Sequence, residues 1–160
     1  MITNIKKATN ADLREMSIIA SENFSGLKNI KKAEKWVACN FSAFPRMQYF
    51  VAVKSGEISG FILWVEKGGF REESVWELEQ IAVSKNFQGQ GIGAELIEKS
   101  LSEIKKHLEK RGSKLKAVEV TTGTENRAQK LYQRTLGAHK ECIVKNLFRG
   151  DEVIMIARFK

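Results

Sequence analysis

The chain has 160 residues, a net charge of +8 at pH 7 and a pI of about 9.5. This length predicts a single domain over residues 1–160, and the content of 42% hydrophobic and 29% charged residues excludes a disordered chain. Lysines and arginines are mixed with acids instead of gathered into an arm. This pattern argues against nucleic acid as a partner and indicates a solvated surface, with attraction of anions as a secondary effect.

The sequence contains no apolar run near the ~18 residues of a membrane span. Its N-terminal stretch, MITNIKKATNADL, lacks the apolar core of a signal peptide. We therefore expect a cytoplasmic protein without a membrane partner. The two cysteines, Cys39 and Cys142, follow no metal-binding or redox spacing. We expect reduced thiols packed as small apolar groups, and no bound metal.

The first half of the chain predicts a strand and two helices. Weak alternation of polar and apolar residues indicates a strand over residues 2–9. Apolar side chains at helical spacing predict a helix that ends at Asn23, and the next helix is expected over residues 30–41. Trp36 falls on the face of this second helix that is predicted to turn inward.

Three strands are predicted next, over residues 49–53, 58–66 and 75–83. The turn KSGE joins the first two as a hairpin, because its glycine tolerates a positive φ. The first half of the chain therefore ends in an antiparallel meander.

The second half alternates helices and strands. Six apolar residues at steps near 3.6 predict a long helix that Gly112 ends: Ile92, Leu96, Ile97, Leu101, Ile104 and Leu108. A strand over 115–122, a helix over 126–136 and strands over 140–148 and 152–159 follow. This order predicts a mixed sheet with helices packed on it.

The stretch QGQGIGA, residues 88–94, places Gly89, Gly91 and Gly93 at alternate positions before the long helix. A plain turn would need one glycine rather than three. A dinucleotide fold is a second interpretation, because Gly89, Gly91 and Ala94 match G-x-G-x-x-A, but that motif belongs in a first βαβ unit. The third interpretation is an anion cradle. The first N–H groups of a helix lack internal partners, and glycines let a diphosphate approach them.

The same stretch resembles motif A of the GNAT superfamily of N-acetyltransferases, whose signature Q/R-x-x-G-x-G/A is met by Gln88, Gly91 and Gly93. The preceding ELEQIAV is similar to the family's fourth strand. The segment AVEVTTGTENRAQKLYQRTLGA is similar to its fifth strand, fourth helix and glycine turn. The resemblance implies an α+β fold, with a mixed, mostly antiparallel twisted sheet of about seven strands flanked by about four helices.

The resemblance also implies acetyl-CoA as co-substrate. The backbone of Ile81, Ala82 and Val83 would pair with the pantetheine arm. The pyrophosphate would lie against Gln88, Gly89, Gln90, Gly91, Ile92, Gly93 and Ala94.

Asn126 is a weaker candidate for cofactor contact. The family places an asparagine two residues before the arginine of N-x-R-A-x-x-L-Y, whereas Glu125 stands there in this chain and Asn126 directly precedes Arg127. Asn126 is therefore either a pantetheine contact or a helix cap.

Acetyl transfer to an amine needs a base for the amine and an acid for the leaving thiolate. Tyr132 matches the family tyrosine that often protonates the CoA sulfur, although its helix face also fits a core tyrosine. Glu77 and Glu79, two apart on a strand, share a face and are the first base candidates. Glu119 is the next candidate, and ordered water or a role in binding a cationic acceptor remain alternatives.

The acceptor is the least determined part of the site. In the family it is shaped by the first two helices and the last strand pair, and it could be a small amine, an amino sugar, an antibiotic or a protein N-terminus. Many relatives dimerise, so a homodimer is compatible with the resemblance. The alternative function is a non-catalytic acyl-CoA-binding regulatory module on the same fold, which would need neither the glutamates nor Tyr132.

Overall fold

The computed structural model describes residues 3–160. Its first half follows the predicted order: β1 Asn4–Lys7, α1 Leu13–Asn23, α2 Ile30–Ser42, β2 Met47–Lys54, β3 Glu57–Lys67 and β4 Glu73–Val83. The second half comprises α3 Ile92–Lys110, β5 Lys114–Gly123, α4 Gln129–Leu136, β6 His139–Val144 and β7 Glu152–Arg158. Three short 3-10 helices, η1 Asn10–Asp12, η2 Ser25–Leu27 and η3 Lys85–Phe87, lie in the connections.

The seven strands form one sheet in the order β1-β2-β3-β4-β5-β7-β6. Strands β4 and β5 pair in parallel, whereas β1 with β2, β5 with β7 and β6 with β7 pair antiparallel. This mixed, mostly antiparallel sheet with four α-helices confirms the predicted fold class.

The chain divides into two compact units, and the strands β3 and β4 and the helix α3 each contribute residues to both. The first unit holds the residues up to Trp64 together with Gln80–Ser100, and the second holds Val65–Glu79 and Leu101–Lys160.

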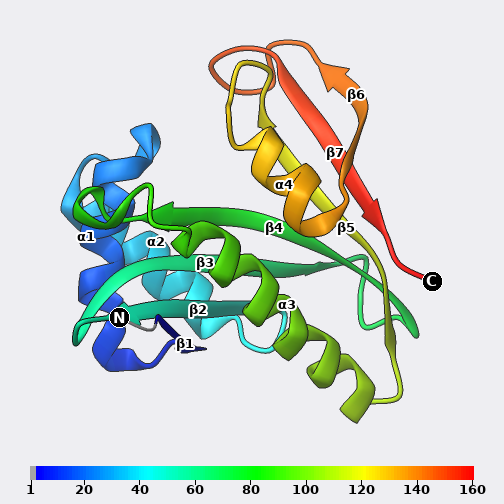
Figure 1. The fold of residues 1–160 in the computed structure, drawn as a ribbon, viewed down its shortest axis with the longest axis horizontal. Coiled ribbons are helices and arrows are strands. Elements are labelled where there is room, and N and C mark those ends of the chain that lie inside the picture. Colours follow the sequence, from blue (N-terminus) through cyan, green and yellow to red (C-terminus); the bar gives the residue numbers. More distant parts are fainter. Residues whose placement is uncertain (1–2) are drawn as a thin grey trace. The chain divides into compact units, whose positions relative to one another are not determined.

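In the first unit, α1 and α2 cover one face of the strands and the first half of α3 covers the other (Figure 1). A buried hydrogen bond ties α3 to the sheet, because Trp64 Nε1 donates to Ser100 Oγ at 2.8 Å. The apolar residues that α3 turns inward, including Leu96 and Ile97, are fully buried as their spacing predicts.

The second unit contains a saturated polar cluster around Glu66, whose side chain is 1% exposed. Arg111 binds both carboxylate oxygens of Glu66, Ser74 Oγ donates to Oε1 at 2.6 Å, and Trp76 Nε1 donates to Ser74 Oγ at 2.9 Å. Arg111 Nε also donates to Ser113 Oγ at 3.0 Å. Burial alone would raise the pKa of the Glu66 carboxyl, but the bonds from Arg111 and Ser74 hold that pKa below its ordinary value.

The largest differences from the predicted element boundaries are at the start of α4 and the end of β6. Helix α4 begins at Gln129 rather than 126, because Asn126 N–H bonds Gly123 O at 2.9 Å and forms a turn there. Strand β6 ends at Val144 rather than 148, because Asn146 takes a φ of 49° and its N–H bonds Asp151 Oδ1 at 3.1 Å.

Two statements about single side chains also need correction. Trp36 is 44% exposed rather than buried, because it lines a cavity instead of the core. Cys39 and Cys142 are both free, but they are exposed rather than packed.

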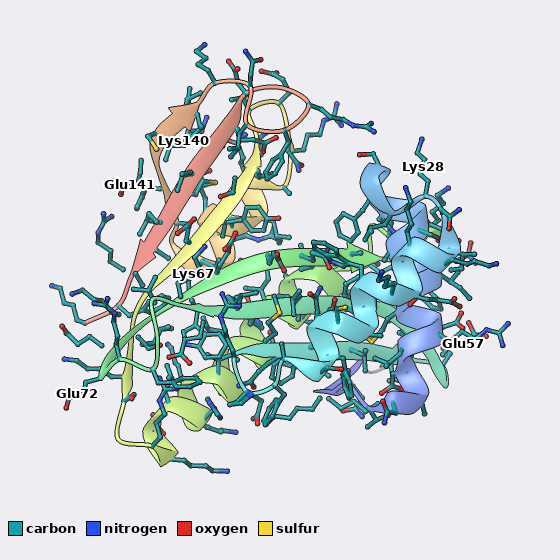
Figure 2. The ribbon with its side chains drawn as sticks, turned by 180° about the vertical axis from the view of Figure 1, so that it is seen from behind. Lys28, Glu57, Lys67, Glu72, Lys140 and Glu141 are labelled. Atoms are coloured by element: carbon teal, nitrogen blue, oxygen red, sulfur yellow. The ribbon has the colours of Figure 1, made fainter. Side chains whose placement is uncertain are left out.

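Charged side chains cover the surface, with both signs interspersed, as the mixed sequence pattern indicates; Figure 2 labels Lys28, Glu57, Lys67, Glu72, Lys140 and Glu141. Over residues 3–160, no helix has the length and apolar character needed to cross a membrane.

Candidate functional site

The loop between η3 and α3 turns the chain sharply at two glycines. Gly89 has a φ of 76° and Gly91 a φ of 80°, a region that residues with a Cβ adopt only with strain. A Cβ at either position would meet no atom within 4 Å. The backbone conformation, rather than lack of space, therefore requires glycine here. Gly93 lies inside α3.

The loop presents a row of unpaired backbone donors. Within residues 3–160, none of the N–H groups from Gln88 to Gly93 donates a hydrogen bond, whereas Ala94 N–H bonds Gly91 O at 3.1 Å. The row ends at the first turn of α3, a helix of 19 residues whose N-terminus carries partial positive charge. Such a row of donors is suited to an anion of several oxygens, such as a diphosphate. We call residues Gln88–Gly93 the donor loop.

Side chains hold the donor loop in place. Gln88 Nε2 donates to Val83 O at 3.1 Å, and Gln90 Nε2 donates to Asn86 O at 3.3 Å. Lys54 Nζ donates to Gln90 Oε1 at 2.7 Å. This contact brings a positive charge from β2 to the loop, which the sequence pattern did not predict.

The strand segment Ile81–Val83 leads into the donor loop and packs closely on β3. A Cβ added to Gly60 would lie 2.7 Å from Ala82 O, so only glycine permits this approach of the two strands. Val83 O already accepts the amide of Gln88 and, at 3.5 Å, the amide of Asn23. Main-chain hydrogen bonds to a pantetheine arm would therefore use the other backbone N–H and C=O groups of Ile81–Val83.

The candidate bases lie in the second unit. Glu77 and Glu119 are direct partners in the parallel pairing of β4 with β5, which brings these two residues together. Glu77 Oε2 forms an ion pair with Lys67 Nζ at 2.8 Å, and proton uptake would break that pair. The Glu119 carboxylate makes no hydrogen bond or ion pair with the described residues. Glu79 is exposed.

Tyr132 lies on α4 and is 5% exposed. Burial raises the pKa of its phenol to about 12, so the hydroxyl stays protonated at neutral pH. No described residue is a hydrogen-bond partner of this hydroxyl. The buried ring thus serves as packing, while its hydroxyl remains available as a donor.

Asn126 is engaged locally. Its Nδ2 donates to Thr122 Oγ1 at 2.9 Å and its Oδ1 accepts Ala128 N–H at 2.9 Å. These bonds hold the turn before α4, whose N-cap is Ala128, so Asn126 is not the residue that caps the helix.

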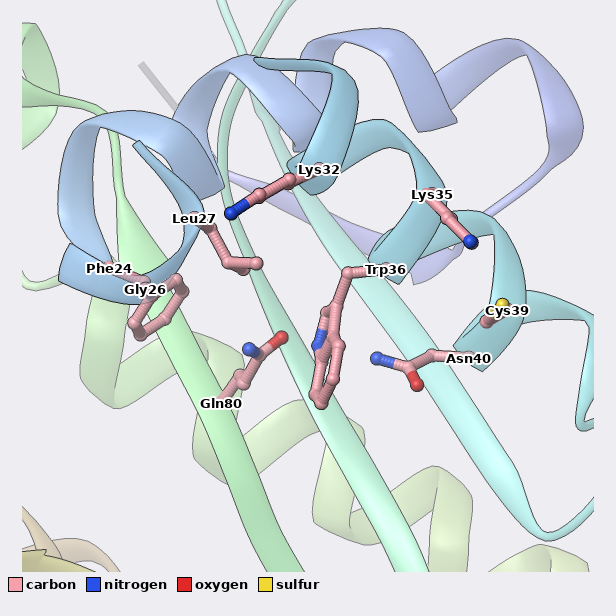
Figure 3. A pocket seen from close by; sticks show the side chains of 9 residues that line it. All are labelled: Phe24, Gly26, Leu27, Lys32, Lys35, Trp36, Cys39, Asn40 and Gln80. Carbon is pink, nitrogen blue, oxygen red and sulfur yellow. The ribbon is translucent and has the colours of Figure 1, made fainter. Parts of the chain in front are cut away.

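The first unit also holds a cavity of about 610 Å³ that sequence reasoning did not predict. It lies where the end of α1, η2 and α2 meet β4, and Figure 3 shows the Trp36 ring standing within it. Its lining is mostly apolar and comprises Phe24, Gly26, Leu27, Lys32, Lys35, Trp36, Cys39, Asn40 and Gln80. The first two helices were expected to shape the acceptor site, and this cavity lies at that place.

Clusters of three or more His, Cys, Asp or Glu side chains able to hold a metal are absent from the described part of the chain.

Comparison with known proteins identifies the family. Residues 13–138 match the family described as Acetyltransferase (GNAT) family. The chain belongs to this family. An uncharacterized N-acetyltransferase of Methanocaldococcus jannaschii is 30% identical over 155 residues, which cover 92% of this chain and 64% of that protein. The chain thus spans about two thirds of the length of this curated relative.

Solved structures share the GNAT fold. Ard1 of Thermoplasma volcanium superposes with a TM-score of 0.79 at 15% identity, covering 100% of this chain and 99% of that chain. A chain of the NatC complex bound to Gag peptide and CoA gives a TM-score of 0.77 at 15% identity, with 100% of both chains covered. At these identities, the likeness concerns the fold alone.

Proposed function

We propose that this GNAT protein transfers the acetyl group of acetyl-CoA to an amine by direct attack in a ternary complex. The observation that carries the proposal is the donor loop, whose unpaired N–H groups lie at the N-terminus of a long helix. Membership of the GNAT family and the glycine signature at Gly91 and Gly93 support the same assignment.

In the proposed reaction, the amine nitrogen attacks the thioester carbonyl. A C–N bond forms, the C–S bond breaks, and the electron pair leaves with sulfur. The donor loop binds the diphosphate of the co-substrate, and the backbone of Ile81–Val83 orients its pantetheine arm. These contacts hold the two reactants in the geometry of attack, which accounts for much of the rate that such a ternary complex achieves.

The proton transfers are assigned to side chains of the second unit. We assign the acid to Tyr132, which is protonated at neutral pH and has its hydroxyl free of described protein partners. Glu119 is the favoured base, because its carboxylate is unpaired, and Glu79 is the second candidate. Glu77 is the weaker one because of its ion pair with Lys67.

The proposal is tested by release of free thiol from acetyl-CoA in the presence of a panel of amines, together with calorimetric titration of acetyl-CoA. We expect binding, and thiol release that depends on at least one amine. Binding without turnover across the panel would favour a non-catalytic acyl-CoA-binding module. Absence of binding would overturn the assignment of the donor loop.

A further inference from the structure

The cavity at α1, η2, α2 and β4 has walls suited to a flat apolar group. Phe24, Leu27 and Trp36 line it, and its volume of about 610 Å³ falls within the roughly 300–1,000 Å³ of small-molecule sites. Trp36 is 44% exposed, although Ala33 and Val37 of the same helix are fully buried. An exposed indole in a cavity offers a stacking surface for an aromatic or aliphatic ligand.

The charge of the cavity is positive. Lys32 and Lys35, one turn apart on α2, are the charged residues in its lining, and neither forms an ion pair with any residue from 3 to 160. Figure 3 shows the two side chains leaving α2 on either side of Trp36, Lys32 toward Leu27 and Lys35 toward Cys39. Low-dielectric walls concentrate the field of such charges. A polyamine or another polycation is therefore disfavoured, and a carboxylate is attracted.

Two amides form the polar part of the cavity. Asn40 is 7% exposed and donates from Nδ2 to Tyr49 Oη at 3.1 Å, which fixes its orientation. Gln80 Oε1 is buried without a hydrogen-bond partner among the described residues. Since an unpaired buried acceptor is costly, an N–H group of a bound ligand would stabilise it.

The cavity adjoins the segment assigned to the co-substrate. Gln80 directly precedes Ile81, and Asn23, the residue before Phe24, contacts Val83 O. All of these residues belong to the first unit. A molecule in the cavity would thus lie beside the strand segment proposed to orient the pantetheine arm.

We propose that the acetyl acceptor is an amine on an apolar, preferably aromatic, body that also carries a carboxylate. This inference rests on the proposed function. The apolar body occupies the space beside Trp36, the carboxylate is attracted by Lys32 and Lys35, and the N–H group lies near Gln80.

Binding can be measured without turnover, because Trp36 is the exposed one of the three tryptophans, while Trp64 and Trp76 are 0% exposed. Neutral acrylamide therefore quenches mainly Trp36. L-Phenylalanine should protect Trp36 at a concentration at least about tenfold lower than L-phenylalaninamide does, and added salt should narrow the gap. Equal protection by the two compounds, or better protection by the amide, would overturn the proposal.

Charge reversal tests the same claim in turnover. Relative to wild type, the Lys32→Glu/Lys35→Glu variant should lose at least about tenfold in kcat/KM for L-phenylalanine and gain for L-phenylalaninamide. The control is Lys31→Glu, an exposed lysine of the same helix outside the lining, and it should keep the wild-type preference. An unchanged preference in the double variant would contradict the role of the two lysines.

The source of the carboxylate is distinguished by comparing L-phenylalanine with the amide-capped dipeptides Phe-Glu and Phe-Gln. Preference for Phe-Glu over both other substrates would indicate a peptide terminus with an acidic neighbour, and preference for phenylalanine would indicate a free amino acid. Either result supports an acceptor that combines an amine, an apolar body and a carboxylate, whereas preference for Phe-Gln or for spermidine contradicts it. Failure of acetyl-CoA to bind would overturn the proposed function alone, since quenching of Trp36 requires no acetyl-CoA.

Discussion

The donor loop and the cluster around Glu66 are both rich in polar groups, but these groups are paired in the cluster and unpaired in the loop. Around Glu66, the carboxylate, the guanidinium of Arg111 and the hydroxyl of Ser74 are all paired with one another. In the donor loop, the N–H groups from Gln88 to Gly93 have no partner in the described chain. A saturated cluster stabilises the fold, whereas an unsaturated row at a helix terminus is prepared for a ligand. The comparison predicts that substitutions in one region alter stability and those in the other alter binding.

The largest effect is expected for Arg111→Met, which leaves the buried carboxylate of Glu66 without its counter-ion. The free energy of unfolding should fall by about 3–5 kcal/mol in urea denaturation, while the acetyl-CoA affinity of the folded protein stays unchanged. Lys106→Met is the control, because it removes an exposed pair with Glu103 and should have no measurable effect. A large loss of affinity in Arg111→Met would remove the distinction between the two regions.

Gly91→Glu tests the donor loop. The new carboxylate would lie within the donor loop and repel a diphosphate, so the Kd for acetyl-CoA should rise about 100-fold or more, equivalent to about 2.7 kcal/mol. Gly112→Glu is a matched control. Gly112 follows the end of α3 with a similar φ of 75°, so a glutamate there imposes a similar backbone strain. Calorimetry that finds equal affinities for the two variants would contradict the assignment.

Tyr132→Phe separates chemistry from packing at one residue. Because the hydroxyl has no described protein partner, stability should not change, and kcat should fall about 100-fold through loss of the proton donor. Rapid-quench measurement of product formation, together with acetyl-CoA affinity, checks this. An unchanged kcat would leave Tyr132 with a packing role only.

Glu77 and Glu119 lie opposite each other on β4 and β5. Glu77 is paired with Lys67, whereas the carboxylate of Glu119 is unpaired in the described chain. Glu119→Gln should lower kcat/KM by about 100-fold, at the low end of general-base effects. Glu77→Gln removes the partner of Lys67 and should have a smaller effect on kcat/KM. The opposite ranking would move the base to Glu77.

The smallest effect is a pH dependence of stability. Because the pKa of Glu66 is lowered on folding, its contribution is present above the ordinary glutamate value of 4.5 and is lost as the pH falls through the lowered pKa. The stability gap between wild type and Glu66→Gln should therefore narrow on acidification below that value. A gap independent of pH would show that the ionised carboxylate contributes nothing.

The sequence predicted the elements that depend on local patterns. The apolar spacing from Ile92 to Leu108 specified α3, and the alternating glycines specified the loop before it, because both signals lie within a few residues. Trp36 was misplaced because helical spacing assigns it to the inward face, and spacing carries no information about a cavity on that face. The Glu66–Arg111 pair was missed because its partners are 45 residues apart and nothing in either neighbourhood points to the other.

The candidate site could likewise be predicted only where it depends on a local motif. The motif that names Gln88, Gly91 and Gly93 located the donor loop, whereas the contact of Lys54 with Gln90 depends on the pairing of distant strands. Asn126 fitted two roles in the sequence, and the bonds of its amide to Thr122 and Ala128 place it in the turn before α4 instead of at the N-cap. The cavity around Trp36 combines residues from α2, η2 and β4, so no local pattern could reveal it.

The central claim, that the donor loop binds a diphosphate, is tested most directly by amide NMR of the ¹⁵N-labelled protein titrated with CoA and with pantetheine, which lacks the diphosphate. We predict that the N–H signals of Gly89, Gly91 and Gly93 shift downfield with CoA and hardly move with pantetheine. Signals that remain in place with CoA, or that move equally with both compounds, would contradict the account.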